Sequence, residues 1–231
     1  MNEEQKPLIS IVIPVFNESK TVAAVIKRIN DLQVSKEIIV VDDGSTDGSK
    51  EIIGAMEKQY TFKLITNTSN KGKGASVLAA VKLATGKYLV VEDSDMELNP
   101  QDILKMLGMI RTKNVDLVNG NRKVTSTKNT NFISLLAKKT TKILLWLLYG
   151  KNINDLLCSY KLCTLENFKT LDLQSQRFAF ETEWIIKALK NKWIIKEAFI
   201  DYYPRKITEG KKITAKDGFG IIWNIIKYRF S

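Results

Sequence analysis

Two aspartates separated by one residue follow a short apolar run near the middle of the chain. Asp93 and Asp95 come directly after Tyr88–Val91, a run typical of a buried strand. The carboxyl edge of an open α/β sheet is where such folds bind ligands. Oxygen ligands without neighbouring His or Cys suit Mg²⁺ or Mn²⁺, which commonly bridge carboxylates to substrate phosphates. This D-x-D element therefore predicts a metal-held diphosphate, with a solvated turn as the alternative.

Acidic residues also follow two other predicted strands. Glu18 comes after the apolar run Leu8–Val15, and Asp42 and Asp43 come after Glu37–Val41. The alternative for each is local, because these sequences also favour turns and helix caps. Three carboxylate clusters at one sheet edge would repel one another unless cations or hydrogen-bond donors lie among them. Their combination therefore predicts a binding site.

A glycine-rich segment, Asn70–Ala75, precedes a helical pattern. Glycines at a helix N-terminus let backbone N–H groups approach an anion or a base edge. The alternative is a tight turn that packs a helix closely on the sheet. The helix itself is predicted over Gly74–Ala84, because Ala75, Leu78, Ala79, Lys82 and Leu83 recur at i, i+3, i+4 spacings.

The apolar runs alternate with helical periods, which predicts a doubly wound, mostly parallel α/β sheet in one continuous domain spanning 1–231. The predicted strands are 8–15, 37–41, 62–65, 87–91, 115–118, 160–162 and 194–203. The predicted helices are 21–32, 48–58, 74–84, 100–112, 132–149, 180–190 and 217–230.

The chain carries a net charge of +11, which favours anionic partners. No acidic residue occurs between Leu117 and Asn154. Within that stretch, 132–149 has the pattern of a basic amphipathic helix, which predicts binding in a membrane interface. The alternative is a helix packed on the core beneath solvated lysines.

The chain contains no histidine, so a Ser-His-Asp triad and a His-ligated zinc site are excluded. Cys158 and Cys163 lack metal-ligand company and are expected to be reduced packing residues. The N-terminal residues lack the pattern of a signal peptide, and the longest apolar run, Ile143–Tyr149, is too short to span a membrane. We therefore expect a cytoplasmic protein, peripheral on the inner face of the membrane.

The ordered motifs resemble the family 2 glycosyltransferases with a GT-A fold, and among them the polyprenyl-phosphate branch that includes dolichyl-phosphate mannosyl- and glucosyltransferases. The first group of motifs is Pro14-x-x-Asn17-Glu18, Asp42-Asp43-Gly44-Ser45, Asn70-x-Gly72-x-Gly74-x-Ser76, Asp93-x-Asp95 and Gly120-Asn121-Arg122. The later motifs, which indicate the branch, are Asp155–Lys161, Phe180–Glu183, Tyr203–Arg205 and Glu209–Ile213.

This resemblance implies an inverting transfer from a nucleotide-sugar donor, with 8–120 binding the donor and 121–231 facing the acceptor and membrane. The implied donor-binding residues are Pro14, Phe16, Glu18, Asp42, Asp43, Asp93, Ser94, Met96, Lys211 and Lys212. The implied metal ligands for Mg²⁺ or Mn²⁺ are Asp93, Asp95 and Glu97. The implied catalytic residues are Asp95 together with Arg122 and Arg205, which would face the acceptor phosphate and the diphosphate.

Three functions compete at this stage. The first is sugar transfer to a polyprenyl phosphate, whose phosphate is already largely dianionic at neutral pH and needs no strong protein base. A separate membrane-anchoring protein could assist it. The second is transfer to a glycan or another soluble hydroxyl acceptor, for which Glu181 or Glu183 would have to serve as the base. The third, nucleic-acid binding, is disfavoured because aromatic residues do not interleave with the basic clusters.

Overall fold

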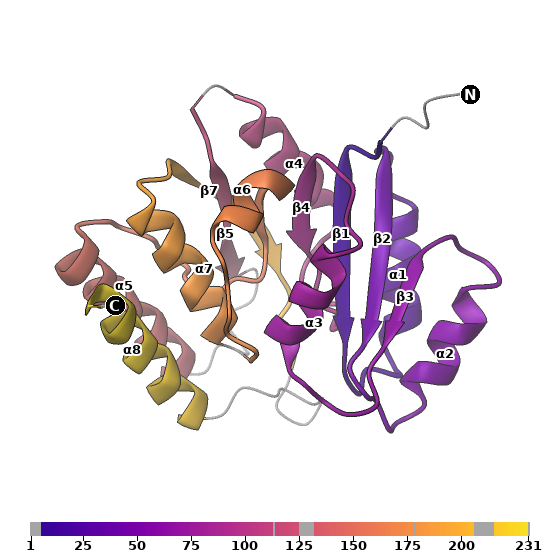
Figure 1. The fold of residues 1–231 in the computed structure, drawn as a ribbon. Coiled ribbons are helices and arrows are strands. Elements are labelled where there is room, and N and C mark those ends of the chain that lie inside the picture. Colours follow the sequence, from indigo (N-terminus) through magenta and orange to yellow (C-terminus); the bar gives the residue numbers. More distant parts are fainter. Residues whose placement is uncertain (1–5, 113, 125–131, 178, 206–214, 231) are drawn as a thin grey trace.

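The computed structural model describes residues 6–112, 114–124, 132–177, 179–205 and 215–230 (Figure 1), without the side chains of 124, 132–138, 215–221 and 230. The strands of this part of the chain are β1 (Ile9–Val15), β2 (Lys36–Asp42), β3 (Lys63–Thr66), β4 (Tyr88–Val91), β5 (Leu117–Val124), β6 (Lys161–Thr164) and β7 (Ile195–Tyr202).

The strands of the described residues form one seven-stranded sheet in the order β3-β2-β1-β4-β6-β5-β7. The first four strands in this order, β3, β2, β1 and β4, are parallel to one another, as predicted. β7 is parallel to β5, while β6 lies between β4 and β5 and is antiparallel to both. The prediction of a doubly wound, mostly parallel sheet is confirmed, with β6 as the reversed strand.

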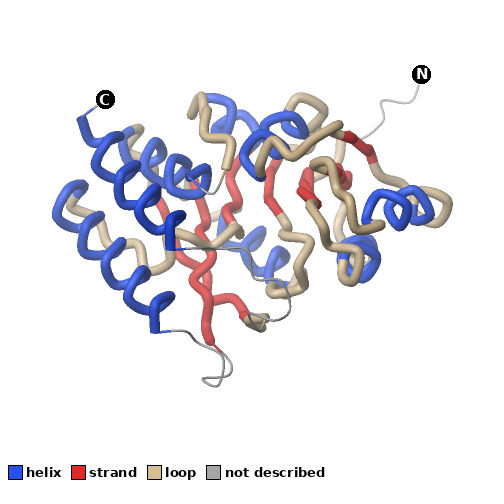
Figure 2. The backbone as a smooth tube through the Cα atoms, turned by 90° about the horizontal axis from the view of Figure 1, so that it is seen from below, coloured by secondary structure: helices blue, strands red, loops and turns tan. Residues whose placement is uncertain are grey.

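Helices cover both faces of the sheet (Figures 1 and 2). One face packs against α1, α2 and α4, and the other against α3 and α5–α8. Their bounds are α1 (Val22–Asn30), α2 (Ser49–Met56), α3 (Lys73–Val81), α4 (Gln101–Ile110), α5 (Phe132–Tyr149), α6 (Leu165–Thr170), α7 (Ala179–Lys190) and α8 (Ala215–Phe230).

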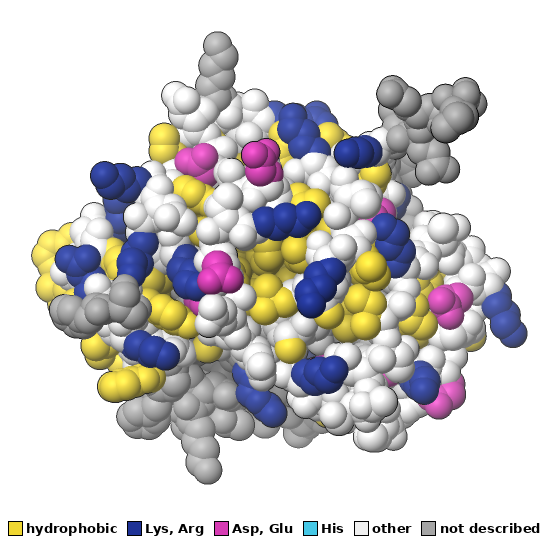
Figure 3. All heavy atoms as spheres, viewed as in Figure 1, with side chains coloured by type: hydrophobic (Ala, Val, Ile, Leu, Met, Phe, Trp, Pro, Cys, Tyr) yellow, Lys and Arg dark blue, Asp and Glu magenta, His cyan; other side chains and the backbone are white. Residues whose placement is uncertain are grey.

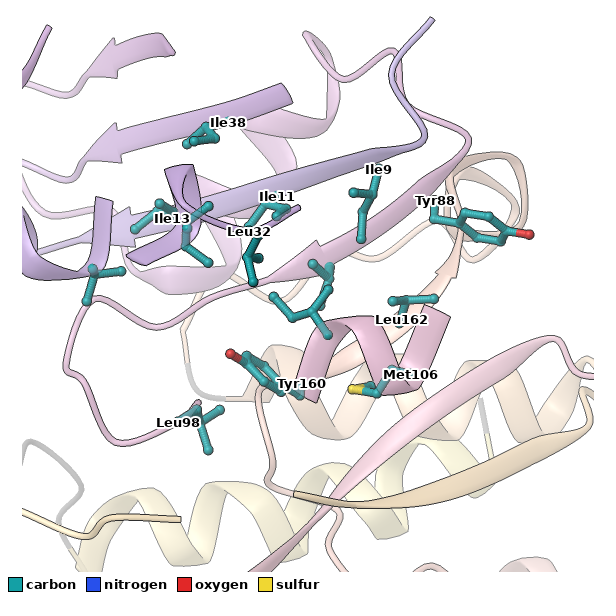
Figure 4. Close-up of a cluster of buried hydrophobic side chains, with 14 of the residues drawn as sticks. Ile9, Ile11, Ile13, Leu32, Ile38, Tyr88, Leu98, Met106, Tyr160 and Leu162 are labelled. Atoms are coloured by element: carbon teal, nitrogen blue, oxygen red, sulfur yellow. The ribbon is translucent and has the colours of Figure 1, made fainter. Parts of the chain in front are cut away.

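The core is built from branched aliphatic side chains of the central strands. Ile9, Ile11 and Ile13 alternate along β1 and are fully buried, and they meet Met106 of α4 and Tyr160 in one cluster (Figure 4). Strands buried on both faces carry continuous apolar runs, because each residue packs on one helix layer or the other. This packing fixes where the strands end, and therefore where the acidic residues lie.

The predicted helix is present as α3, but the residues that gave its spacing are not its buried face. Val77, Ala80 and Val81 are the buried apolar residues, whereas Leu83 is 43% exposed. The reason lies at the start of the helix, where a Cβ added to Gly74 would lie 2.0 Å from the Ser175 carbonyl oxygen. This close approach sets the rotation of α3, and side-chain periodicity alone does not reveal it.

Glu37 of β2 ties the opposite, N-terminal end of the sheet together. Its carboxylate accepts hydrogen bonds from Ser10 Oγ at 2.5 Å, Lys63 Nζ at 2.7 Å, Thr85 N at 2.5 Å and Gly86 N at 2.9 Å. Burial opposes ionisation, but these donors outweigh it and lower the pKa of Glu37 from 4.5 to about 2.

We predict that Glu37→Gln lowers the free energy of unfolding at pH 7 by about 1–3 kcal/mol, because several donors lose a charged acceptor. A carboxylate with a depressed pKa stabilises the fold above its unfolded pKa, and this contribution is lost as pH falls from about 4.5 toward 2. The gap between wild type and variant in urea unfolding should therefore narrow at pH 3. Glu51→Gln, an exposed change on α2, is the control, and a gap independent of pH would contradict the assignment.

Candidate active site

The three acidic strand ends meet at one edge of the sheet, because β2, β1 and β4 are adjacent (Figure 2 views this edge). Hydrogen bonds join the loops that follow these strands. Asp43 N donates to the Val15 carbonyl at 2.8 Å, and Ser94 Oγ donates to the Pro14 carbonyl at 3.0 Å. Thr21 Oγ1 donates to the Ser94 carbonyl at 2.7 Å. The strand ends therefore form one connected surface.

Helix capping does not explain these acidic residues. The N-caps of α1 and α2 are Thr21 and Gly48, and neither makes a side-chain cap bond. Asn17 instead has a left-handed φ of 53° and accepts from Thr46 N at 2.8 Å. Asp42 Oδ1 accepts from Ser45 N at 3.1 Å, which is a local turn. The polar residues thus connect neighbouring loops rather than close helices.

Asp43 organises the glycine-rich segment. Its carboxylate accepts from Asn67 Nδ2 at 2.8 Å, Lys71 N at 3.0 Å and Gly72 N at 2.7 Å. Gly72 has φ 98°, and an added Cβ would lie 2.5 Å from the Gln176 carbonyl, so this position requires glycine. Asp43 therefore shapes the loop from β3 to α3, and its predicted contact with the nucleoside stays a prediction.

Arg205 brings the C-terminal part of the chain to the acidic edge. Its guanidinium donates to both carboxylate oxygens of Glu18, at 2.9 and 3.2 Å, and to Asp95 Oδ2 at 3.4 Å. Its Nε lies 3.8 Å from Glu97 Oε1, and its backbone N donates to the same oxygen at 3.0 Å. The structure thus brings together Glu18, Asp95, Glu97 and Arg205, all of which the sequence had predicted as site residues.

A second set of charges extends inward from Asp93. Lys73, at the start of α3, bridges Asp93 Oδ1 at 2.6 Å and Glu181 Oε1 at 2.8 Å. The other oxygen of Glu181 lies 3.0 Å from the ammonium of Lys161, whose side chain is fully buried. Two carboxylates and two ammonium groups therefore alternate in a row, which we term the Lys73–Lys161 charge row.

The two aspartates of the D-x-D element differ in electrostatics. Burial raises the pKa of Asp95 to about 7, and the charges of Asp93 and Glu97 add to the effect. Burial also opposes ionisation of Asp93, but Lys73 outweighs it and lowers the pKa of that carboxyl. Glu92 is buried beside them and accepts a hydrogen bond from the Tyr160 hydroxyl, and burial raises its pKa. Asp95 is thus the carboxylate that lacks sufficient compensating positive charge.

The donor set at this edge fits a hard divalent cation. Asp93 and Asp95 would supply only carboxylate oxygens as ligands, and a bound cation would stabilise the ionised form of Asp95. Among the described residues, no three acidic, His or Cys side chains lie together as a ready-made metal site. An ion would therefore use one or two carboxylates and complete its shell with water and phosphate oxygens, as Mg²⁺ usually does. A ligand role for Glu97 stays a prediction.

Arg122 lies at the far side of the site, on β5. Its Nε and Nη2 donate to the two oxygens of Asp155, each at 2.8 Å, and its guanidinium lies 5.0 Å from the centre of the Tyr202 ring. The bidentate pair holds the guanidinium in one plane. Cys158 lies buried nearby, and burial raises the pKa of its thiol to about 12, so it is a packing residue, as predicted.

The carboxylate of Glu183, in the first half of α7, is held by hydrogen bonds and an ion pair. It accepts from Gln174 N at 3.1 Å and Ser175 N at 2.7 Å, and it pairs with Lys187 at 2.9 Å. Burial opposes ionisation, but Lys187 and the Ser175 donors outweigh it and lower the pKa of Glu183. A carboxylate with a lowered pKa and several donors is a weak proton acceptor.

Four other residues were predicted to bind the donor. Phe16 is half-buried beside the acidic edge, and Met96, with φ 64°, accepts a hydrogen bond from Arg28 at its sulfur. Lys211 and Lys212 lie outside the described residues. Sequence reasoning assigned no role to Lys73, Lys161 or Asp155, although Asp155 and Lys161 begin and end one of the motifs of the family resemblance. Lys73 also had a signal, because it lies between two glycines at a helix start.

Comparison with known proteins identifies the class. The chain superimposes on the crystal structure of glucosyl-3-phosphoglycerate synthase from Mycobacterium tuberculosis in complex with Mn²⁺, UDP and phosphoglyceric acid, with a TM-score of 0.75 and 17% identity over 97% of this chain and 79% of that one. The Mg²⁺ and UDP complex of the same enzyme gives a TM-score of 0.73 at 18% identity. The fold is that of the GT-A glycosyltransferases.

The family model for glycosyl transferase family 2 matches residues 10–171, and the chain belongs to this family. It is 26% identical to dodecaprenyl-phosphate galacturonate synthase of Rhizobium johnstonii, over 77% of this chain and 54% of that protein. It is 27% identical to the low-salt glycan biosynthesis hexosyltransferase Agl6 of Haloferax volcanii, over 87% of this chain and 49% of that protein. The chain thus spans about half of each of these two relatives. An uncharacterized Methanocaldococcus jannaschii protein matches at 28% over nearly its whole length, 98%.

We predict that Lys73→Met lowers the free energy of unfolding by about 3 kcal/mol, because it leaves Asp93 and Glu181 without the cation between them. Urea unfolding followed by circular dichroism measures the loss. Lys71→Met, two residues earlier and exposed, removes the same charge and should stay within about 0.5 kcal/mol of wild type. Equal effects of the two changes would show that the charge row does not hold the site together.

Proposed function

We propose that this family 2 glycosyltransferase is an inverting enzyme that moves a sugar from a nucleotide-sugar, such as GDP-mannose or a UDP-sugar, to a polyprenyl phosphate at a membrane surface. The observation that carries the proposal is that the carboxylates of both glutamates of α7 are in contact with lysines or hydrogen-bond donors. Glu181 is paired with Lys73 and Lys161, and Glu183 is held by Lys187 and two backbone amides.

These contacts weigh against a hydroxyl acceptor. A sugar or alcohol hydroxyl must lose its proton during attack, and the alternative function assigned that task to Glu181 or Glu183. Lys187 and the Ser175 donors lower the pKa of Glu183, which makes it a poor base, and each oxygen of Glu181 is in contact with a lysine ammonium. A phosphate monoester, whose second pKa is near 6, attacks the anomeric carbon without such a base.

The donor side supplies the rest of the mechanism. Asp93 and Asp95 would hold Mg²⁺ or Mn²⁺, which when bound stabilises the leaving nucleoside diphosphate as a Lewis acid. Arg205, at the same edge, adds a fixed cation for the diphosphate, and Phe16 and Asp43 border the space proposed for the nucleoside. The solved Mycobacterium tuberculosis complexes with UDP and Mn²⁺ or Mg²⁺ support this donor and metal type, and the Rhizobium relative's name supports a polyprenyl phosphate.

Arg122 is our candidate for the acceptor phosphate. Its pairing with Asp155 orients the guanidinium from β5, and a planar guanidinium binds phosphate through two parallel hydrogen bonds. Asp155 therefore fixes the orientation of the Arg122 guanidinium. The acceptor half of the proposed site is therefore pre-organised by an ion pair within the chain.

The apolar surface of α5 and α8 supports a membrane position. Ile143, Trp146 and Leu147 of α5 are exposed, as are Trp223 and Ile226 of α8, and the two helices pack together. Basic side chains accompany them on this part of the surface (Figure 3), including exposed Lys139, Lys227 and Arg229. Lys142 is half-buried, and its ammonium donates to Asn154 Oδ1 at 2.6 Å.

Two exposed tryptophans with flanking cations are typical of a surface that rests on anionic lipid. None of the described helices has the length and apolar content needed to span a bilayer. We therefore propose contact with the inner, cytoplasmic membrane face, with or without a separate anchoring protein. The two free cysteines are compatible with a reducing compartment.

We predict that the purified protein, screened with UDP- and GDP-sugars and Mg²⁺ or Mn²⁺, glycosylates polyprenyl phosphate and leaves the matching free polyprenol unmodified. Excess EDTA and Asp95→Ala should each abolish most product, measured by mass spectrometry. Glu183→Gln should lower the rate by less than about tenfold, since loss of a true general base costs about 10²–10⁴-fold.

One result would contradict the prediction that the acceptor is a polyprenyl phosphate. If polyprenol or a soluble glycan is the better acceptor, and Glu183→Gln abolishes transfer, the enzyme uses a hydroxyl acceptor and the proposal is wrong. Arg122→Lys distinguishes the acceptor side, because an ammonium keeps the charge but loses the two-pronged contact. It should impair use of polyprenyl phosphate while nucleotide affinity in calorimetry stays the same.

We predict that the protein cosediments with phosphatidylglycerol-containing vesicles and that salt weakens this binding, since surface charges are screened. Replacing Trp146 and Trp223 together by serine should release it. Phe199→Ser is the matched control, because Phe199 is 68% exposed but lies on β7. Cosedimentation that survives the double tryptophan change, or that is lost equally in the control, would assign the membrane contact to another surface.

A further inference from the structure

The guanidinium of Arg205 lies against the carboxylate of Asp95. Its guanidinium contacts Glu18, Asp95 and Glu97, and none of the four side chains is more than 21% exposed. The backbone of this segment is fixed as well, because Tyr203 N donates to the Glu97 carbonyl at 2.9 Å and Arg205 N donates to Glu97 Oε1. Chain far from the D-x-D element in sequence is thus attached directly to it.

The fit of this guanidinium is incomplete. Its contact with Asp95 is long, at 3.4 Å, whereas its contact with Glu18 is bidentate. Its Nε is buried and, within the described part of the chain, donates to no acceptor, since Glu97 Oε1 is 3.8 Å away. A buried donor without an acceptor is costly, so this arrangement is one that a better acceptor could replace.

We propose that Arg205 is the resident counter-ion of the acidic edge, and that it competes with a divalent cation for Asp95. A guanidinium and a metal ion beside the same carboxylate repel each other, because both are cations in a partly buried site. The diphosphate of a donor relieves this conflict. Its oxygens accept from the guanidinium, including the unsatisfied Nε, and at the same time provide ligands for the metal.

The consequence is an order of events built into the site. Without nucleotide, Arg205 suppresses metal binding, and the negative charge of a bound diphosphate would allow both cations to stay at the acidic edge. Arg205 therefore adds to the coupling between metal and nucleotide, and by linkage each raises the affinity of the other. This inference rests on the metal-assisted donor site of the proposed function, but it does not depend on the identity of the sugar or acceptor.

The test is Mn²⁺ binding, read from the electron paramagnetic resonance signal of free Mn²⁺, with no nucleotide and with UDP or GDP. In wild type, nucleotide should tighten Mn²⁺ binding by about 5–150-fold, the usual range of coupling between two sites. In Arg205→Met, Mn²⁺ should bind more tightly without nucleotide, and nucleotide should tighten Mn²⁺ binding less than in wild type, because only direct ligation by its phosphate oxygens remains. Arg205→Gln, which keeps donors but no charge, should behave likewise and serves if the methionine variant does not fold.

Lys27→Met is the control for net charge, because Lys27 lies on α1 in an exposed pair with Asp31. It removes one positive charge without touching the site and should leave the Mn²⁺ affinities as in wild type. Unchanged metal affinity in the nucleotide-free Arg205 variants, or wild-type binding that ignores nucleotide, would overturn the inference while leaving the proposed transfer reaction standing. Absence of Mn²⁺ binding in every protein, with or without nucleotide, would overturn both.

Discussion

The need to neutralise carboxylates at one edge of a parallel sheet determines much of this structure. Adjacent parallel strands deliver Glu18, Asp93 and Asp95 to the same edge, where they would repel one another. The compensating cations come from elsewhere in the chain: Lys73 from the start of α3, and Arg205 from beyond β7. The first half of the molecule therefore supplies the negative charge, and the second half contributes to balancing it.

The same compensation shapes the chemistry. Once Lys73 is required to hold Asp93, it also pairs with Glu181, and Lys161 completes the row from β6. Glu181 is thereby committed to the charge balance of the acidic edge, with a lysine ammonium against each of its oxygens. An active site arranged in this way favours a nucleophile that arrives already deprotonated. The phosphate acceptor that we propose is consistent with the way these charges are held together.

The fold and the acidic edge were predictable because their signals are local. Each strand is an apolar run, each acidic pair follows directly after one, and parallel order brings the pairs together. Local signals do not give the partners of these acids, since Arg205 and Glu18 are separated by 187 positions, and only the family resemblance assigned Arg205 to the site. Lys161 looked like one residue of a strand, and its burial depends on β6 running against its neighbours. The short helix α6, capped by Thr164 through Asn167 N, was missed because six residues show no helical period.

The reversed strand β6 has a mechanical consequence. It pairs with β4 through Leu89 and Cys163, and with β5 through Val118 and Leu162, so backbone hydrogen bonds cross from the D-x-D strand to the strand that bears Arg122. A hinge between these two parts would have to break both ladders. Backbone hydrogen bonds therefore hold this part of the sheet together, and they set the separation between the strand end that bears Asp93 and Asp95 and the strand that bears Arg122. Substrates must be admitted by rearranging side chains and loops above the sheet, and the enzyme differs in this respect from those that close two lobes around their ligands.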